Sequence, residues 1–66
     1  MPTSHAFAIE IHGRPAGIVV SDPSGFVFFA AERTFYALER RVFKDVAHAQ
    51  RAAQQTLAAQ NARRRG

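Results

Sequence analysis

The sequence predicts a small α+β domain in which a three-stranded antiparallel meander packs against a carboxy-terminal α-helix. Residues 7–11 alternate in polarity with a period of two, as in a strand with one buried face. Residues typical of turns follow at 12–13 and at 22–25. After Ala31 the chain contains no glycine or proline until Gly66, and its apolar residues recur at steps of three and four, which indicates helix.

The first hairpin is predicted to turn tightly at His12–Gly13. Glycine accepts the positive φ that such a turn needs, and histidine tolerates it better than most residues. This turn pairs Phe7 with Ile18, so that both strands place their large apolar residues on one face. A three-residue loop at 15–17 would break that agreement, and we reject it.

The second hairpin is predicted to turn at Asp22–Gly25, with a three-residue loop and a bulge. Asp22 then lies opposite Phe26, and Val20 lies opposite Phe28. The face expected to form the core carries Phe7, Ile9, Ile18, Val20, Phe26 and Phe28.

The third strand, Phe26–Ala31, is apolar on both faces and therefore needs cover on both. A chain of 66 residues buries only about 60% of its unfolded surface, which leaves little material for a second layer. The sequence has no cysteine, so neither a disulfide nor a thiolate metal site can reinforce the core. We therefore expect the second face to be a protein interface, with the candidate residues Ala8, Val19, Val27 and Phe29.

The expected partner is a second copy of the chain, in a homodimer, or another protein. A homodimer could form sheet to sheet or by pairing of an outer strand, and the sequence leaves both geometries open. Partial cover of the same face by Phe35, Tyr36 or the terminal segment is the alternative.

The region after Ala31 is predicted to contain two helical segments. A single helix over 32–63 would be about 48 Å long, whereas a six-residue strand spans about 20 Å. The composition also changes at Lys44–Asp45, from mediocre helix formers to alanine and glutamine. We expect a short helical turn near Arg33–Leu38, an irregular or extended link, and a helix from about Asp45 to Ala62, with Asp45 as its N-cap.

The net charge of +4 depends strongly on the carboxy-terminal arginines, since Arg63–Arg65 supply three of the nine Lys and Arg residues. We expect one domain over 1–66, ordered over about 5–61, with a frayed basic tail at 62–66. The sequence has no secretory leader pattern and no apolar run near the ~20 residues that span a bilayer. A cytoplasmic protein of bacterial type is therefore expected.

No catalytic residue, cofactor site or metal site is predicted. His5, His12 and His48 lack the close spacing of metal ligands. The serines lie in predicted turns or near the terminus, and the five carboxylates are scattered along the chain. We expect a noncatalytic protein without a cofactor or a small-molecule substrate, which acts as a protein-interaction or self-associating module.

The segment Gly25-Phe26-Val27-Phe28-Phe29 partly resembles the aromatic strand motif of the RNA-recognition-motif family, which stacks bases on an open sheet. The resemblance covers this strand alone, and Ser24 stands where the motif has a basic residue. The chain is also too short for that family's four strands and two helices. We make no family assignment.

The second functional hypothesis is a basic accessory protein that binds nucleic acid. Lysine and arginine side chains contact phosphates in a manner that is independent of sequence and sensitive to salt. The candidate basic patch consists of Arg33, Arg40, Arg41, Lys44 and Arg51.

Overall fold

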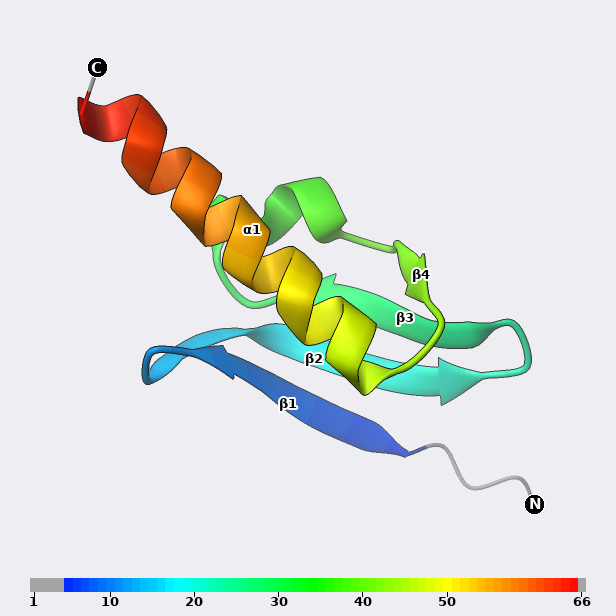
Figure 1. The fold of residues 1–66 in the computed structure, drawn as a ribbon. Helices are drawn as coiled ribbons and strands as arrows, with labels where there is room; N and C mark the ends of the chain where they lie inside the picture. The colour runs from blue at the N-terminus through cyan, green and yellow to red at the C-terminus, as the bar shows by residue number, and fades with distance from the viewer. Residues whose placement is uncertain (1–4, 66) are drawn as a thin grey trace.

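A computed structural model describes residues 5–65 of the chain, with side chains for 5–62. It contains an antiparallel sheet in the spatial order β1-β2-β3-β4 and a carboxy-terminal helix that crosses one face of the sheet (Figure 1). The elements are β1 (Ala6–Ile11), β2 (Arg14–Asp22), β3 (Gly25–Ala30), the 3₁₀ helix η1 (Arg33–Leu38), β4 (Val42–Phe43) and α1 (Val46–Arg65). The predicted α+β class is confirmed, and so are the helical turn and the separate carboxy-terminal helix.

The predicted number of strands is wrong, because the link after η1 adds a fourth. Val42–Phe43 pairs antiparallel with β3. The same ladder continues toward η1, where the Phe28 N–H donates to the Arg41 carbonyl at 2.9 Å and the Arg40 N–H donates to the Phe28 carbonyl at 2.8 Å. This segment therefore satisfies backbone groups on the outer edge of β3.

The first hairpin turns where the sequence predicts. Ile11 pairs with Arg14 across the two turn residues His12 and Gly13. Their φ values are 53° and 76°, as a tight two-residue hairpin turn requires.

A β-bulge at Ala16 changes the register beyond this turn. Glu10 pairs with Pro15, whereas Ile9 pairs with Gly17, so Ala16 has no partner residue on β1. Because successive side chains of a strand point to opposite faces, one extra residue reverses the face of every later residue.

The second hairpin is consistent with this shift. Asp22 pairs with Gly25, so the loop contains two residues rather than the predicted three. Val19 therefore pairs with Phe28, the position predicted for Val20. The predicted core positions of Ile18 and Val20 are wrong: Val19 has no exposed surface, whereas Ile18 is 42% exposed.

The core lies between the sheet, η1 and α1. Apolar residues from all six elements contribute to it, and the buried ones are Ile9, Ile11, Ala16, Val19, Phe28, Phe35, Leu38, Phe43, Ala49, Ala53 and Leu57. Phe28 is at the centre of the sheet and meets Phe43 edge to face, with the ring centroids 6.2 Å apart. Phe7, which the sequence places in the core, is 42% exposed and packs against the Phe26 ring at 6.0 Å.

Helix α1 begins at the predicted cap. The Asp45 carboxylate accepts a hydrogen bond from the His48 backbone N–H at 2.8 Å, as an N-cap residue does. The helix continues to Arg65, three residues beyond the predicted end at Ala62. Of the tail predicted to fray, Gly66 lies outside the described residues. Neither helical segment in the described part of the chain combines the length and apolar composition of a membrane span.

We predict that Gly17→Ala destabilises the fold. An added Cβ would lie 2.3 Å from the backbone oxygen of Phe29 and 3.0 Å from the Phe28 ring, so β2 and β3 would have to separate. Overpacking of this kind costs about 1–3 kcal/mol, a large part of the stability of a small domain. Urea unfolding followed by circular dichroism measures the loss. Gly13→Asn is the control, since its added side chain meets open space and asparagine tolerates positive φ; equal loss in both variants would contradict the bulged register.

We also predict that the cap on α1 weakens in acid. Hydrogen bonds from the His48 side chain and backbone N–H lower the pKa of Asp45 from its ordinary value of 3.8. The carboxylate therefore contributes its full stability above that ordinary value and loses it as the pH falls through the lower native pKa. The urea midpoints of wild type and Asp45→Asn should differ more at pH 7 than at about pH 3. A constant difference would show that the charge of Asp45 plays no part.

Candidate protein interface

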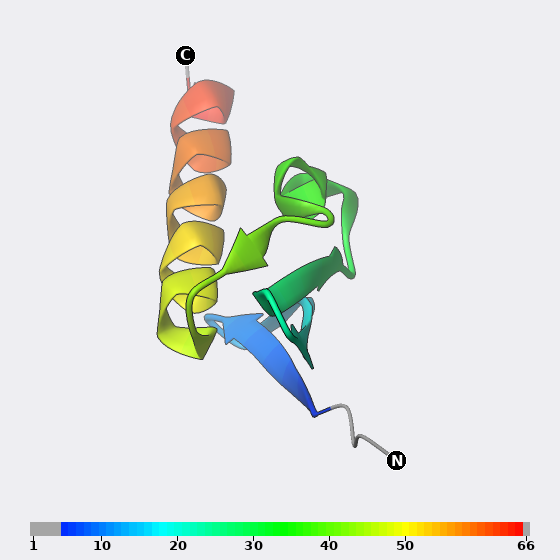
Figure 2. The same ribbon diagram turned by 90° about the vertical axis from the view of Figure 1, so that its right-hand side faces the viewer.

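One face of the sheet is turned away from α1, and we call it the outer face. Figure 2 shows α1 running along the other side of the sheet. The strand pairing and the burial pattern place these apolar residues on the outer face: Ala6, Ala8, Ile18, Val20, Val27, Phe29 and Val42. Ile18 is 42% exposed and Val42 is 50% exposed. Both are large apolar side chains with much of their surface in water.

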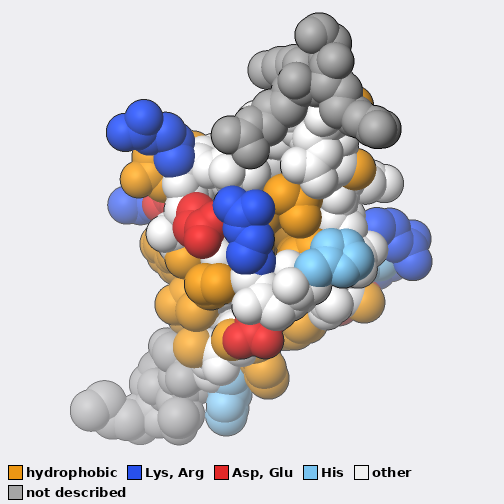
Figure 3. Space-filling view, turned by 90° about the vertical axis from the view of Figure 1, so that its left-hand side faces the viewer, with side chains coloured by type: hydrophobic (Ala, Val, Ile, Leu, Met, Phe, Trp, Pro, Cys, Tyr) orange, Lys and Arg blue, Asp and Glu red, His pale blue; other side chains and the backbone are white. Residues whose placement is uncertain are grey.

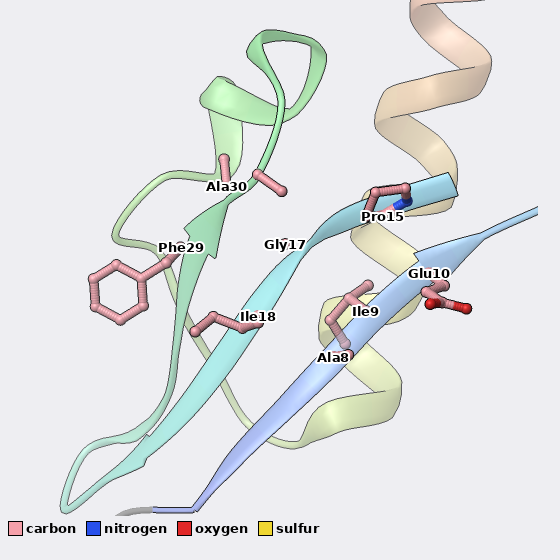
Figure 4. A pocket seen from close by; sticks show the side chains of 9 residues that line it. Ala8, Ile9, Glu10, Pro15, Gly17, Ile18, Phe29 and Ala30 are labelled. Carbon is pink, nitrogen blue, oxygen red and sulfur yellow. The ribbon is translucent and has the colours of Figure 1, made fainter. Parts of the chain in front are cut away.

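The pairing arranges these residues in two rows that cross the strands. The first row contains Ala6, Val20, Val27 and Val42, and the second contains Ala8, Ile18 and Phe29. Side chains on one face of directly paired residues lie about 5 Å apart, so each row is a continuous apolar strip. In Figure 4 the side chains of Ile18 and Phe29 leave the sheet on the side away from α1.

Two shallow hollows flank Phe29 on this face. One has a volume of about 340 Å³ and is lined by Ala8 and Ile18 among others (Figure 4). The second has a volume of about 310 Å³ and is lined by Val20 and Val27. Because Phe29 borders both hollows, its ring forms a ridge between them.

Arg40 extends the second row toward the edge of the sheet. Its guanidinium carbon lies 5.7 Å from the centroid of the Phe29 ring, within the range of a cation–π contact. Arg40 has a φ of 67°, which is uncommon for a residue other than glycine. The neighbouring Glu39 carboxylate accepts a hydrogen bond from the Ala30 N–H at 2.7 Å and so ties this segment to β3. Arg40 thus partly covers Phe29.

The alternative expectation that Phe35 or Tyr36 covers this face is corrected by these contacts. Phe35 has no exposed surface and belongs to the core. Tyr36 is 61% exposed. The partial cover of Phe29 on this face comes instead from Arg40, a residue predicted to belong to the basic patch.

The predicted interface residues divide in two. Ala8, Val27 and Phe29 lie on the outer face, as expected. The prediction that Val19 belongs to the interface is wrong, because the bulge turns Val19 into the core, where it has no exposed surface. Sequence reasoning missed Ile18 and Val20 on this face. The signal that could have found them is a glycine inside the second strand, which often marks a bulge.

The predicted basic residues come from several elements. Arg33 lies on η1, Arg51 on α1, and Lys44 between β4 and α1. Arg40 stacks on Phe29 at the outer face, whereas the guanidinium carbon of Arg41 lies 5.4 Å from the ring of the buried Phe43. In the view of Figure 3 the lysine and arginine side chains stand apart from one another, with apolar and acidic side chains between them.

Base stacking and metal binding are two other hypotheses that the structure bears on. Phe28 has no exposed surface and cannot stack on a base, which agrees with our rejection of the RNA-recognition-motif assignment. Among the described residues, no group of three His, Cys, Asp or Glu side chains is placed to hold a metal ion. The arrangement on the outer face is suited to apolar contact with a rim of charge.

No protein-family model, curated protein or solved structure matches this chain.

The bulge predicts losses of stability of different size at two adjacent positions of β2. Val19→Ala removes buried methyl groups and should cost about 1–3 kcal/mol. Ile18→Ala removes a side chain that is 42% exposed in a single copy and should cost about 1 kcal/mol or less in a dilute sample. Urea unfolding at low protein concentration compares the two. A larger loss at Ile18 than at Val19 would mean that β2 presents the other face to α1.

Proposed function

We propose that the chain is a noncatalytic protein-interaction module that uses its outer face to bind a second protein surface, either another copy of itself or a different protein. The observation that carries this proposal is the pair of apolar rows, in which Ile18 and Val42 have about half of their surface in water. Contiguous apolar patches of this kind are typical of interaction sites on soluble proteins.

The size of the face supports this role. Three strands about 20 Å long and the two-residue β4, spaced by about 4.8 Å, cover roughly 300 Å², at the lower end of the range of the largest apolar patches on monomers, which are often functional. Burial of apolar surface contributes about 25 cal/mol per Å². A second surface laid on this face would therefore gain free energy from both rows together.

The charges around the face add specificity to the proposal. Arg40 lies at one edge, and Glu10 and Asp22 occupy outer-face positions beyond the apolar rows. Charged side chains at the rim of an interface influence orientation and association rate more than raw affinity. The outer face thus has an apolar centre and a polar rim, the usual anatomy of a protein interface.

The free edge of β1 offers a second surface. β1 is the terminal strand of the sheet, and its six residues contain no proline or lysine, two residue types that commonly protect such edges. We place the main interaction on the outer face rather than on this edge, because the exposed large aliphatic side chains among the described residues, Ile18 and Val42, lie on the outer face.

We do not extend the proposal to nucleic acid. Binding to a phosphate backbone needs several cations on one surface. Arg40 and Arg41, which are adjacent in the sequence, stack on rings that belong to opposite faces of the sheet.

Site-specific photo-crosslinking tests the proposed function. A photoreactive phenylalanine analogue is placed at Ile18 or at Val42 in the outer face, and at Gln54 on the exposed side of α1 as the matched control. In cells that produce the chain, we expect covalent adducts with protein from the first two positions and far fewer from the third. Mass spectrometry of the adducts shows whether the partner is this chain or another. Equal yields at all three positions would contradict a dedicated interface.

A further inference from the structure

We propose that the outer face pairs with the outer face of a second copy, in an isologous dimer whose two-fold axis runs parallel to the strands and whose edges are closed by two Arg40–Glu10 ion pairs. This inference rests on the proposed function and names the partner and the geometry of the same face. It depends on where the charges lie relative to the two apolar rows.

The two charged residues lie at opposite edges of the outer face. Arg40 is next to β3, in line with the row of Ala8, Ile18 and Phe29, since its N–H bonds the carbonyl of the residue before Phe29 and its guanidinium covers the Phe29 ring. Glu10 is on β1, two residues beyond Ala8 and on the same face. Arg40 and Glu10 are therefore separated by the full width of the sheet and by about 7 Å along the strands.

A two-fold axis parallel to the strands brings these charges together. It places β1 of each copy opposite the β4 edge of the other copy. Each apolar row then faces the same row of the other copy. Arg40 then faces Ala8 of the partner subunit, and Glu10 of the partner subunit lies one side-chain position further along the same strand. An arginine side chain can span that distance, and the symmetry forms the pair twice.

The other face-to-face arrangement lacks this match. With an axis across the strands, each strand faces the same strand of the other copy. The first row of one copy then faces the second row of the other. Arg40 would then face the apolar Val42 of the partner subunit, and Glu10 would stay at the distant edge without an opposite charge. In this arrangement no opposite charge lies near Arg40 to compensate for the loss of its solvation. Charge complementarity therefore favours the axis parallel to the strands.

The relief of the outer face fits the same arrangement. With the axis parallel to the strands, the Phe29 ridge faces Ile18 of the partner subunit, which borders the hollow of about 340 Å³. A ridge from each copy thus meets a hollow of the other. Within the described residues, Glu10 makes no salt bridge, and Arg40 has only a long one, with 3.9 Å between its Nε and Glu39 Oε2. Neither side chain therefore has a close ion pair within the described part of the chain, and Arg40 can approach an opposite charge from its position over the Phe29 ring.

The size of the face sets the expected affinity. Roughly 300 Å² from each copy gives about 600 Å² in total, well below the 1,200–2,000 Å² of stable interfaces, as in weak transient contacts. We therefore expect a reversible dimer with a dissociation constant of about micromolar or weaker. Association should also weaken as salt rises, because the ion pairs lie at the exposed edges.

Charge reversal with rescue is the decisive experiment. Sedimentation equilibrium from about 1 μM to 1 mM, at low and high salt, gives the dimer constant of wild type, Arg40→Glu, Glu10→Arg and the double variant. We expect each single reversal to weaken the dimer about tenfold or more, and the double variant to recover to within about threefold of wild type. Arg51→Glu on α1 is the matched control, which changes the charge equally and should leave the constant unchanged.

The outcomes separate this inference from the proposed function. A wild-type dimer without rescue in the double variant would overturn the Arg40–Glu10 geometry and point to pairing through the edge of β1. A monomeric mass throughout the concentration range would exclude the second copy, and the crosslinks from Ile18 would then decide the proposed function independently.

A second measurement does not depend on the charge variants folding. The chain has no cysteine, so single cysteines give unambiguous disulfides. Arg40→Cys mixed with Ala8→Cys should form a mixed disulfide dimer on mild oxidation, whereas Arg40→Cys mixed with Arg51→Cys should not. Equal yields in the two mixtures would also overturn the geometry.

Discussion

The bulge at Ala16 determines how the sheet divides its side chains between core and surface. Ala16 and Gly17 are both buried, and the absence of a side chain at Gly17 leaves room for the ring of Phe28. Phe28 in turn contacts Val19 across the ladder and meets Phe43 from β4. These contacts join β2, β3 and β4 beneath α1, so the extra residue in β2 sets which side chains of the sheet face the core.

The segment that follows η1 links this core to the outer face. The Glu39 carboxylate accepts the N–H of Ala30, and Arg40 adopts a positive φ so that its own N–H reaches β3. A non-glycine residue in that conformation costs on the order of 1 kcal/mol. The hydrogen bonds and the contact with the Phe29 ring offset this cost. The same few residues therefore complete the sheet and place a cation at the edge of an apolar surface.

Local signals in the sequence were sufficient for the elements that local chemistry controls. The turn at His12–Gly13, the helical turn at Arg33–Leu38 and the cap at Asp45 each follow from residue types at short range. The face of β2 could not be predicted in that way. A straight register buries both Ile18 and Val20, so hydrophobic matching favours it, and the preference for the bulge arises only when Gly17 meets Phe28 from another strand. β4 was missed for a similar reason, since two residues carry no periodicity and the strand depends on hydrogen bonds in which the Arg40 N–H donates to Phe28 and the Arg41 carbonyl accepts from Phe28.

The same bulge makes association physically reasonable. It exchanges two large aliphatic side chains, Ile18 and Val20, for one, Val19, in the core of a chain with little apolar material to lose. Full burial of an aliphatic side chain is worth about 1.5–3 kcal/mol, so a register that leaves Ile18 42% exposed forgoes part of that stabilisation in a single copy. A second surface on the outer face restores it, because Ile18, Val27 and Phe29 then lose their contact with water. The bulge thus places apolar area on the surface, and in the dimer that we propose the charges of Arg40 and Glu10 select the orientation in which a second copy covers that area.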